Sequence, residues 1–206
     1  MTFDLEAWLA VVPPSPPIVQ VGATVLRQRA LDVDASLRST PAFAHLVEIM
    51  IDVMRAAPGV GLAAPQIGVP LRVFVAEDDE ERLSRLTDEA RALRGRVGLP
   101  LTVLVNPRVI ATSGDQATFY EGCLSVRGYG ALVARAAAVN VAGVDASGRP
   151  VSLDLGGWPA RIMQHEMDHL DGTLYVDRML SRSLAGEDEL GRLSALPVAE
   201  VIKELC

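Results

Sequence analysis

The sequence predicts an α+β fold in which mixed, largely antiparallel sheets pack around a central helix. Four short apolar runs have the length and composition of strands: residues 71–76, 101–105, 139–144 and 150–155. The last two flank Asp145-Ala-Ser-Gly148, a sequence typical of a hairpin turn. A helix is expected to follow them, starting near Pro159 and ending at Gly172. Strands followed by a central helix favour the α+β class.

The first 17 residues are expected to form a mobile or surface-packed N-terminal extension. Four prolines fall between positions 13 and 17, and we expect them to exclude regular structure from the extension. The first long helix should then begin at Thr40-Pro41, where threonine caps the helix and proline fits its first turn, and should end near Ala56.

This helix has an apolar stripe at helical spacing, formed by Phe43, Val47, Met50 and Met54. His45 falls outside the stripe and is expected on the surface.

The charged stretch 77–98 also repeats apolar residues at helical spacing, at Leu83, Leu86, Ala90 and Leu93. We expect a solvated surface helix there, supported by a Glu81–Arg85 pair.

The helix near Pro159 carries the most informative motif of the chain. Residues 164–169 read Gln-His-Glu-Met-Asp-His, an H-E-x-x-H pattern that uses two of only three histidines. Residues four apart share one face of a helix, so His165 and His169 can bind one metal ion while Glu166 acts as a base. The alternative is a surface helix with two solvated histidines, but the apolar residues around the motif predict a buried helix.

Two imidazoles do not complete a metal site, and the residues leave two candidates for the third ligand. One is the acidic cluster Glu187, Asp188 and Glu189, which lies as far beyond the H-E-x-x-H motif in sequence as the glutamate ligand does in gluzincin peptidases. Such a cluster is more often the solvated start of a helix. The other is Cys123, in Tyr-Glu-Gly-Cys-Leu-Ser-Val. Its alternative roles are an inert core residue or a disulfide with Cys206, although a chain of this size needs no disulfide.

A third segment, Gly59-Val-Gly-Leu-Ala-Ala-Pro-Gln66, combines glycines with apolar residues. This composition predicts a packed loop with unusual backbone angles. Gln66 is its one side chain able to donate a hydrogen bond, and a buried amide needs a partner, for which a substrate is a candidate.

Together these three segments resemble the signature motifs of the peptide deformylases, in the same order and approximate spacing. The resemblance covers roughly residues 18–182, which would form the catalytic domain. Residues 1–17 would then be the extension, and residues 183–206 an acidic tail with a short helix. The implied activity is hydrolysis of the N-formyl group from the formyl-methionine of newly made polypeptides, with release of formate.

The resemblance also implies a role for each site residue. Cys123 would be the third metal ligand, beside His165 and His169. Glu166 would be the general base and then the general acid, and Gln66 would face the oxyanion with the backbone N–H of Leu124.

For the substrate, the resemblance implies an apolar methionine pocket that includes Val60 and Ile162. The peptide backbone would pair in a strand-like manner with Gly61 and Gly122. The implied cofactor is one Fe²⁺ per chain, for which Zn²⁺, Ni²⁺ or Co²⁺ can substitute, because one thiolate and two imidazoles suit all four ions.

The chain departs from the common family pattern at three positions near Cys123. Arg127 stands where the family usually has proline, Gly130 where arginine is frequent, and Ala134 where proline is frequent. These changes affect the loop and the contacts to later substrate residues, but none replaces a metal ligand.

Composition favours a cytoplasmic enzyme, and the resemblance implies that it acts on nascent peptides near the ribosome. The net charge of −7 argues against direct nucleic-acid binding, and residues 184–206 carry a net −3, five acidic against two basic residues. No apolar run is long enough for a membrane span, and the N-terminus lacks a signal-like basic region. The sequence does not indicate an oligomeric state. A gluzincin-type peptidase and a non-enzymatic family member are the alternative functions.

Overall fold

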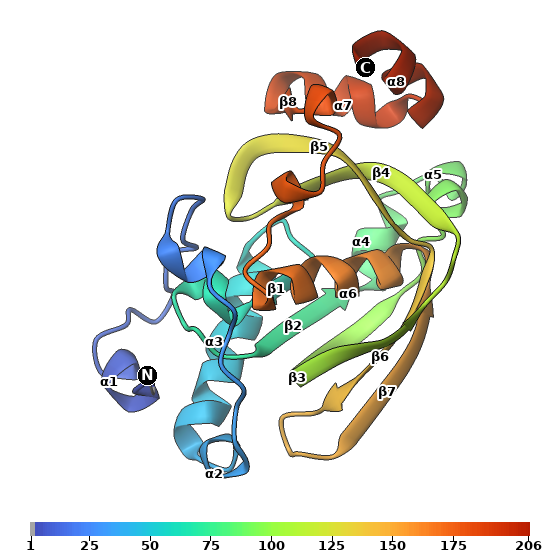
Figure 1. The fold of residues 1–206 in the computed structure, drawn as a ribbon. Helices are drawn as coiled ribbons and strands as arrows, with labels where there is room; N and C mark the ends of the chain where they lie inside the picture. The colour runs from blue at the N-terminus through green and yellow to red at the C-terminus, as the bar shows by residue number, and fades with distance from the viewer. Residues whose placement is uncertain (1–2) are drawn as a thin grey trace.

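The computed structural model describes residues 3–206 and contains two antiparallel sheets with a long helix between them (Figure 1). The first sheet has the order β1 (Gly61–Ala63), β2 (Val73–Asp78), β3 (Leu99–Thr112), β6 (Ala138–Val144) and β7 (Pro150–Gly156). The second has the order β4 (Gln116–Cys123), β5 (Val126–Ala136) and β8 (Ala185–Gly186). Helix α6 (Gly157–Leu170) contacts strands of both sheets. The predicted α+β class with antiparallel sheets is confirmed.

Helix α3 (Pro41–Ala56) forms with the predicted bounds because its start is capped. The hydroxyl of Thr40 accepts a hydrogen bond from the N–H of Phe43, and Pro41 occupies the first turn. All four residues of the predicted apolar stripe are buried, in a core shared with β1 and β2, whereas His45 is exposed as predicted. The helix therefore supports the sheet from which β1 reaches the site.

Replacing Thr40 by alanine is expected to lower the free energy of unfolding by about 1 kcal/mol, because the N–H of Phe43 loses its acceptor. Urea denaturation of the two proteins measures the change. The matched control is Ser84→Ala, which removes an exposed hydroxyl that bonds only within its own helix turn. Equal stability of both variants and the wild type would contradict a capping role.

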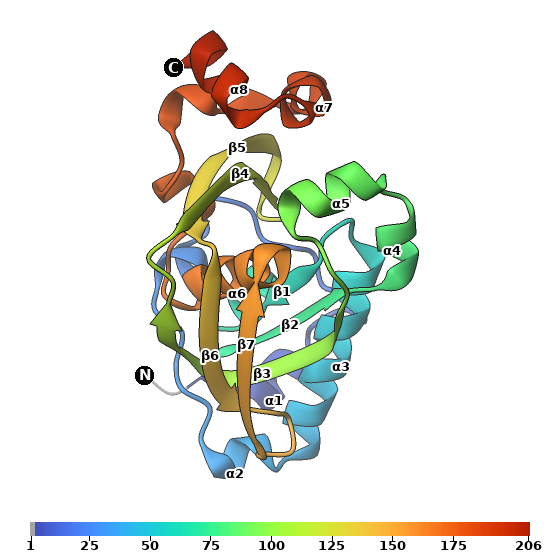
Figure 2. The same cartoon turned by 90° about the vertical axis from the view of Figure 1, so that its right-hand side faces the viewer.

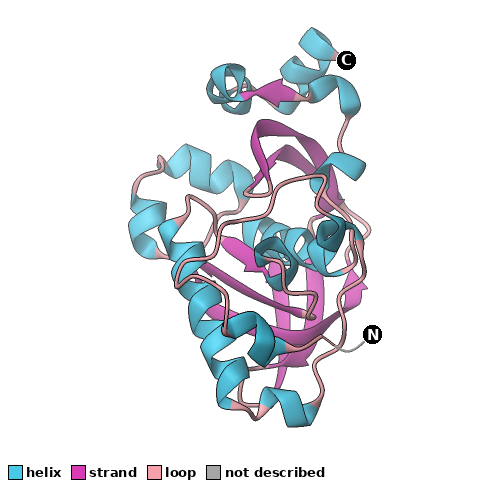
Figure 3. Ribbon diagram, turned by 90° about the vertical axis from the view of Figure 1, so that its left-hand side faces the viewer, coloured by secondary structure: helices cyan, strands magenta, loops and turns pink. Residues whose placement is uncertain are grey.

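The N-terminal segment contains more regular structure than expected. Helix α1 (Leu5–Leu9) forms with Asp4 as its cap, and Leu5 is buried in the core around α3. The prediction failed because the prolines begin only at position 13, beyond this helix. Residues 1 and 2 of the expected extension lie outside the described residues. From α1 to α3 the chain is mainly loop, apart from a 3₁₀ turn at Thr24–Arg27 and α2 (Ala35–Arg38) (Figure 3).

The expected single helix between residues 77 and 98 is two short helices, α4 (Glu80–Ser84) and α5 (Asp88–Arg94). Thr87 accepts a hydrogen bond from the N–H of Ala90 and so starts a new helix. The apolar residues share no face, since Leu83 is fully buried and Leu93 is 67% exposed. The predicted Glu81–Arg85 ion pair is present at 2.7 Å.

The hairpin of β6 and β7 has the predicted turn, while β3 extends well beyond the predicted run 101–105.

After β8 the chain forms α7 (Glu187–Ala195) and α8 (Val198–Leu205), which lie over β5 and β4 in Figure 2. Among residues 3–206, no helix combines the length and the hydropathy needed to cross a bilayer.

Candidate active site

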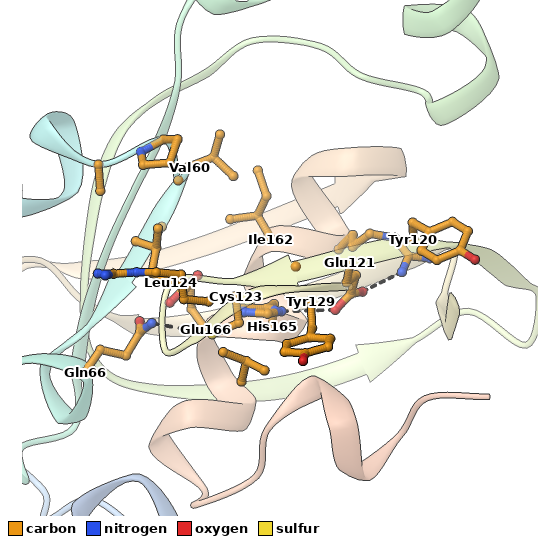
Figure 4. Close-up of a pocket in the computed structure, with 18 of the residues that line it drawn as sticks. Val60, Gln66, Tyr120, Glu121, Cys123, Leu124, Tyr129, Ile162, His165 and Glu166 are labelled. Carbon is orange, nitrogen blue, oxygen red and sulfur yellow. Dashed lines mark hydrogen bonds and ion pairs between the residues drawn. The ribbon is translucent and has the colours of Figure 1, made fainter. Parts of the chain in front are cut away.

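Helix α6 brings both histidines of the motif next to the end of β4. His165 and His169 are one turn apart, with ring centroids separated by 5.1 Å. The Sγ atom of Cys123, the last residue of β4, lies 3.2 Å from Nε2 of His169. One donor atom from each of these three residues lies within 4.8 Å of the other two. Figure 4 shows Cys123, His165 and Glu166 gathered at one point of the pocket.

This cluster has the chemistry of a transition-metal site. One thiolate and two imidazoles are a donor set that zinc, iron, cobalt and nickel accept. Nδ1 of His165 lies 3.0 Å from a carboxylate oxygen of Glu121, and metal-binding histidines commonly bond a carboxylate through the nitrogen that does not bind the metal. The residues therefore fit a bound divalent ion.

Glu121 is the centre of a buried ionic network that connects α6 with the second sheet. Its carboxylate accepts hydrogen bonds from Arg135 on β5 and Arg161 on α6, and Arg135 also bonds Asp168 at 2.8 Å. Burial raises the pKa of Glu121, but the hydrogen bonds from Arg135 and His165 outweigh burial and hold that pKa far below its usual range. A permanent negative charge therefore orients the ring of His165.

Glu166 lines the cavity and lies against Gly61 of β1. Its side chain is buried, and burial raises the pKa of its carboxyl to about 7. The Oε2 atom makes no hydrogen bond within the described part of the chain. A β-carbon at Gly61 would lie 2.3 Å from the Oε1 atom, so β1 can pass the carboxylate only because position 61 is glycine.

Replacing Gly61 by alanine is therefore expected to displace the Glu166 carboxylate and to lower kcat about 10²-fold, as an error of 1 Å in a catalytic group can do. Metal content should not change. Steady-state kinetics and metal analysis of the purified variant test this result. Gly114→Ala is the matched control, because a β-carbon there meets no atom within 4 Å. Unchanged kcat in Gly61→Ala would contradict the steric argument.

Gln66 and Leu124 lie on the side of the cluster opposite Glu121 (Figure 4). The Gln66 side chain is 1% exposed, and its carbonyl oxygen accepts the N–H of Ala63 at 2.8 Å. That bond directs the amide nitrogen toward Ser125 Oγ, at 3.3 Å, and Cys123 Sγ, at 3.7 Å. Leu124 is in the turn that follows Cys123. The buried amide expected in the loop 59–66 is confirmed, with partners inside the chain.

A cavity of about 670 Å³ opens beside the cluster. All four residues predicted to bind substrate line it: Val60, Gly61, Gly122 and Ile162. The cavity also reaches Trp158 and Arg161, which sequence reasoning missed although they lie one turn before Ile162 and His165. Glu187 and Leu190 of α7 complete one wall; the sequence indicated Glu187 only as part of the acidic cluster, and no pattern pointed to Leu190.

The alternative third ligand, Glu189, is not part of the cluster. Its side chain is 60% exposed and pairs with Arg192 at 2.9 Å. Both Cys123 and Cys206 are free thiols, so the alternative disulfide is not formed.

Comparison with known proteins gives one consistent result. The sequence model of the polypeptide deformylase family matches residues 15–184. Peptide deformylase 1 of Streptomyces coelicolor is 50% identical over 194 residues, which cover 94% of this chain and 86% of the relative. Peptide deformylase 3 of Streptomyces avermitilis is 48% identical over 184 residues, covering 89% and 80%.

A solved structure agrees with these sequence relatives. The Met-Ala-Ser-bound crystal structure of a class I type b peptide deformylase from Acinetobacter baumannii superimposes with a TM-score of 0.71. It is 31% identical, and the match covers 80% of this chain and 98% of that chain. The chain thus belongs to the peptide deformylase family, metal-dependent hydrolases that remove the N-formyl group from nascent polypeptides.

Proposed function

We propose that Cys123, His165 and His169 hold the catalytic metal ion of this deformylase. The observation that carries the proposal is the convergence of one thiol and two imidazoles, whose donor atoms lie within 4.8 Å of one another. We further propose Fe²⁺ as the ion used in the cell, with Zn²⁺, Ni²⁺ and Co²⁺ as substitutes, because the donor set accepts all of them. Metal analysis of protein purified without oxygen tests the assignment.

Glu166 is the proposed proton carrier. A divalent ion bound at this site supplies Lewis acidity, which acidifies water and polarises a carbonyl oxygen. The Oε2 atom of Glu166, which has no hydrogen-bond partner within residues 3–206, accepts the proton of the attacking water. The same carboxyl then delivers that proton to the departing α-amine, so that formate and a free N-terminus are released. A carboxyl whose pKa is about 7 is suited to both transfers.

Gln66 and Leu124 are the proposed oxyanion donors. As water attacks the formyl carbon, negative charge develops on the formyl oxygen. The Nε2 group of Gln66 is held near the cluster by its bond to Ala63, and the N–H of Leu124 lies in the turn directly after Cys123. Donors fixed before the reaction lose no free energy to reorganisation, and each typically lowers the barrier by about 2.7–4 kcal/mol.

The substrate is proposed to bind as an additional strand between β1 and β4. Its backbone pairs with Gly61 and Gly122, and its methionine side chain enters the apolar part of the cavity beside Val60 and Ile162. The neighbour from Acinetobacter baumannii is described as bound to Met-Ala-Ser, which supports a short methionyl peptide as ligand here. We also propose a cytoplasmic location close to the ribosome, where formylated N-termini emerge.

The deciding experiment measures formate released from formyl-Met-Ala-Ser by iron-loaded protein kept free of oxygen. We expect one formate for each free α-amine, and no cleavage of casein. Casein cleavage without formate release would instead favour a peptidase. Neither product from metal-loaded protein would favour a non-enzymatic family member.

A further inference from the structure

The C-terminal helix α7 is part of the cavity that holds the proposed catalytic groups. Leu190 and Glu187 line this cavity together with Gly122 and His165. Leu190 reaches the sheet because position 130 is glycine: a β-carbon there would lie 2.8 Å from Leu190 Cδ2. Figure 1 shows α7 above β5, on the side away from α6. The groove along β4 therefore has α6 on one side and α7 on the other.

In the paired strands β4 and β5, alternate residues face α7 and α6. Gly122 pairs with Gly130, and Tyr120 pairs with Leu132. Leu132 and Tyr120 pack in one cluster with Leu190, so these alternate positions face α7. Glu121, between them, bonds His165 and Arg161 and therefore faces α6.

A peptide paired with β4 must obey the same alternation. Its first side chain enters the cavity on the α6 side, beside Ile162, according to the proposed function. Successive side chains of a strand point to opposite faces, so the second one faces α7, above Gly122. Tyr120, Leu190 and Glu187 are the cavity residues on that side.

Glu187 is the charged cavity residue on that side, whereas Arg161 lies on α6 and Arg127 follows the turn after Cys123. Glu187 is exposed and takes part in none of the ion pairs found within residues 3–206, whereas Glu189 and Glu204 of the same helical pair bond Arg192. A lysine or arginine side chain could lay its aliphatic part on Leu190 and Tyr120 and bring its charge to Glu187.

We propose that Glu187 and Leu190 form a subsite for the second residue of the substrate, and that this subsite favours a long basic side chain over an acidic one. The proposal rests on the proposed function, because it uses the same peptide orientation. It gives the C-terminal segment a role in substrate choice that does not involve the reacting atoms.

The test compares kcat/KM for formyl-Met-X-Ser peptides in which X is lysine, glutamate, norleucine or alanine. Wild-type protein should prefer lysine to glutamate, mainly through KM, since this contact is equal in the ground and transition states. Glu187→Gln should lower the lysine-to-glutamate ratio about fivefold, the effect of one exposed ion pair. Leu190→Ala should lower the norleucine-to-alanine ratio.

Asp188→Asn is the matched control, because it removes the same charge from the next residue, which does not line the cavity. The lysine-to-glutamate ratio of this variant should equal that of the wild type. A ratio that Glu187→Gln leaves unchanged, or that Asp188→Asn lowers equally, would overturn the subsite while formate release still supports the enzyme. Absence of formate with every peptide would instead refute the proposed function.

Discussion

Replacing Glu166 by glutamine is expected to lower kcat for formate release by about 10²–10⁴-fold, the range that general acid–base catalysis contributes. Glutamine preserves the size of the side chain but cannot accept a proton from water. The fold and the metal content should remain, because Oε2 of Glu166 makes no hydrogen bond within residues 3–206 that the variant would lose. Stopped and continuous formate assays at saturating substrate measure kcat directly.

Two further measurements make this result specific. Glu48→Gln, an exposed glutamate on α3, should retain wild-type kcat. Metal analysis must find the same ion content in Glu166→Gln and in the wild type. If Glu166→Gln kept most of its kcat, the proton would have to travel through another group, and the assignment of this residue would be abandoned.

Replacing Cys123 by alanine is expected to abolish both metal retention and activity. The variant keeps His165 and His169 but loses the thiolate, and two imidazoles alone leave the ion with half of a four-coordinate shell. We expect metal content to fall from about one ion per chain to near zero after gel filtration. Atomic absorption on the eluted protein, together with the formate assay, measures both losses.

The remaining acidic and thiol groups supply the controls for this second prediction. Cys206→Ala removes the other free thiol and should have no effect on metal content. Glu189→Ala should also retain the ion, since that carboxylate pairs with Arg192 on the surface. The peptidase alternative requires the reverse pattern, in which Cys123→Ala stays metal-loaded and Glu189→Ala does not.

Short sequence patterns predicted the elements whose bounds depend on neighbouring residues, such as helix caps and turns. The bounds of α3 follow from a cap and a first-turn proline, and the hairpin of β6 and β7 follows from its turn residues. The cluster of Cys123, His165 and His169 was predictable for another reason. A helix fixes the spacing of the two histidines, and only Cys123 needed a motif from elsewhere in the chain.

The remaining features depend on contacts between residues that are far apart along the chain, which no short segment of the sequence reveals. Arg135 and Glu121 pair across β4 and β5, and Arg161 joins them from a helix forty residues beyond Glu121. Leu190 reaches the cavity only because β8 attaches the C-terminal segment to β5. The expected helix splits at Thr87 because this residue caps a new helix, which the apolar spacing of residues 83–93 does not indicate.

The attachment of residues 179–186 to β5 also affects how the protein behaves among its own copies. Met179 bridges to Val133, Leu180 donates to the carbonyl of Leu132, and Ala185 pairs with Gly130, so this segment covers the outer edge of β5. An open strand edge is a template for pairing with another chain. A chain cut after Arg178 would expose backbone donors and acceptors along β5, and we expect it to self-associate and precipitate. We therefore expect the C-terminal segment to protect this edge from pairing with a second copy, in addition to forming one wall of the cavity.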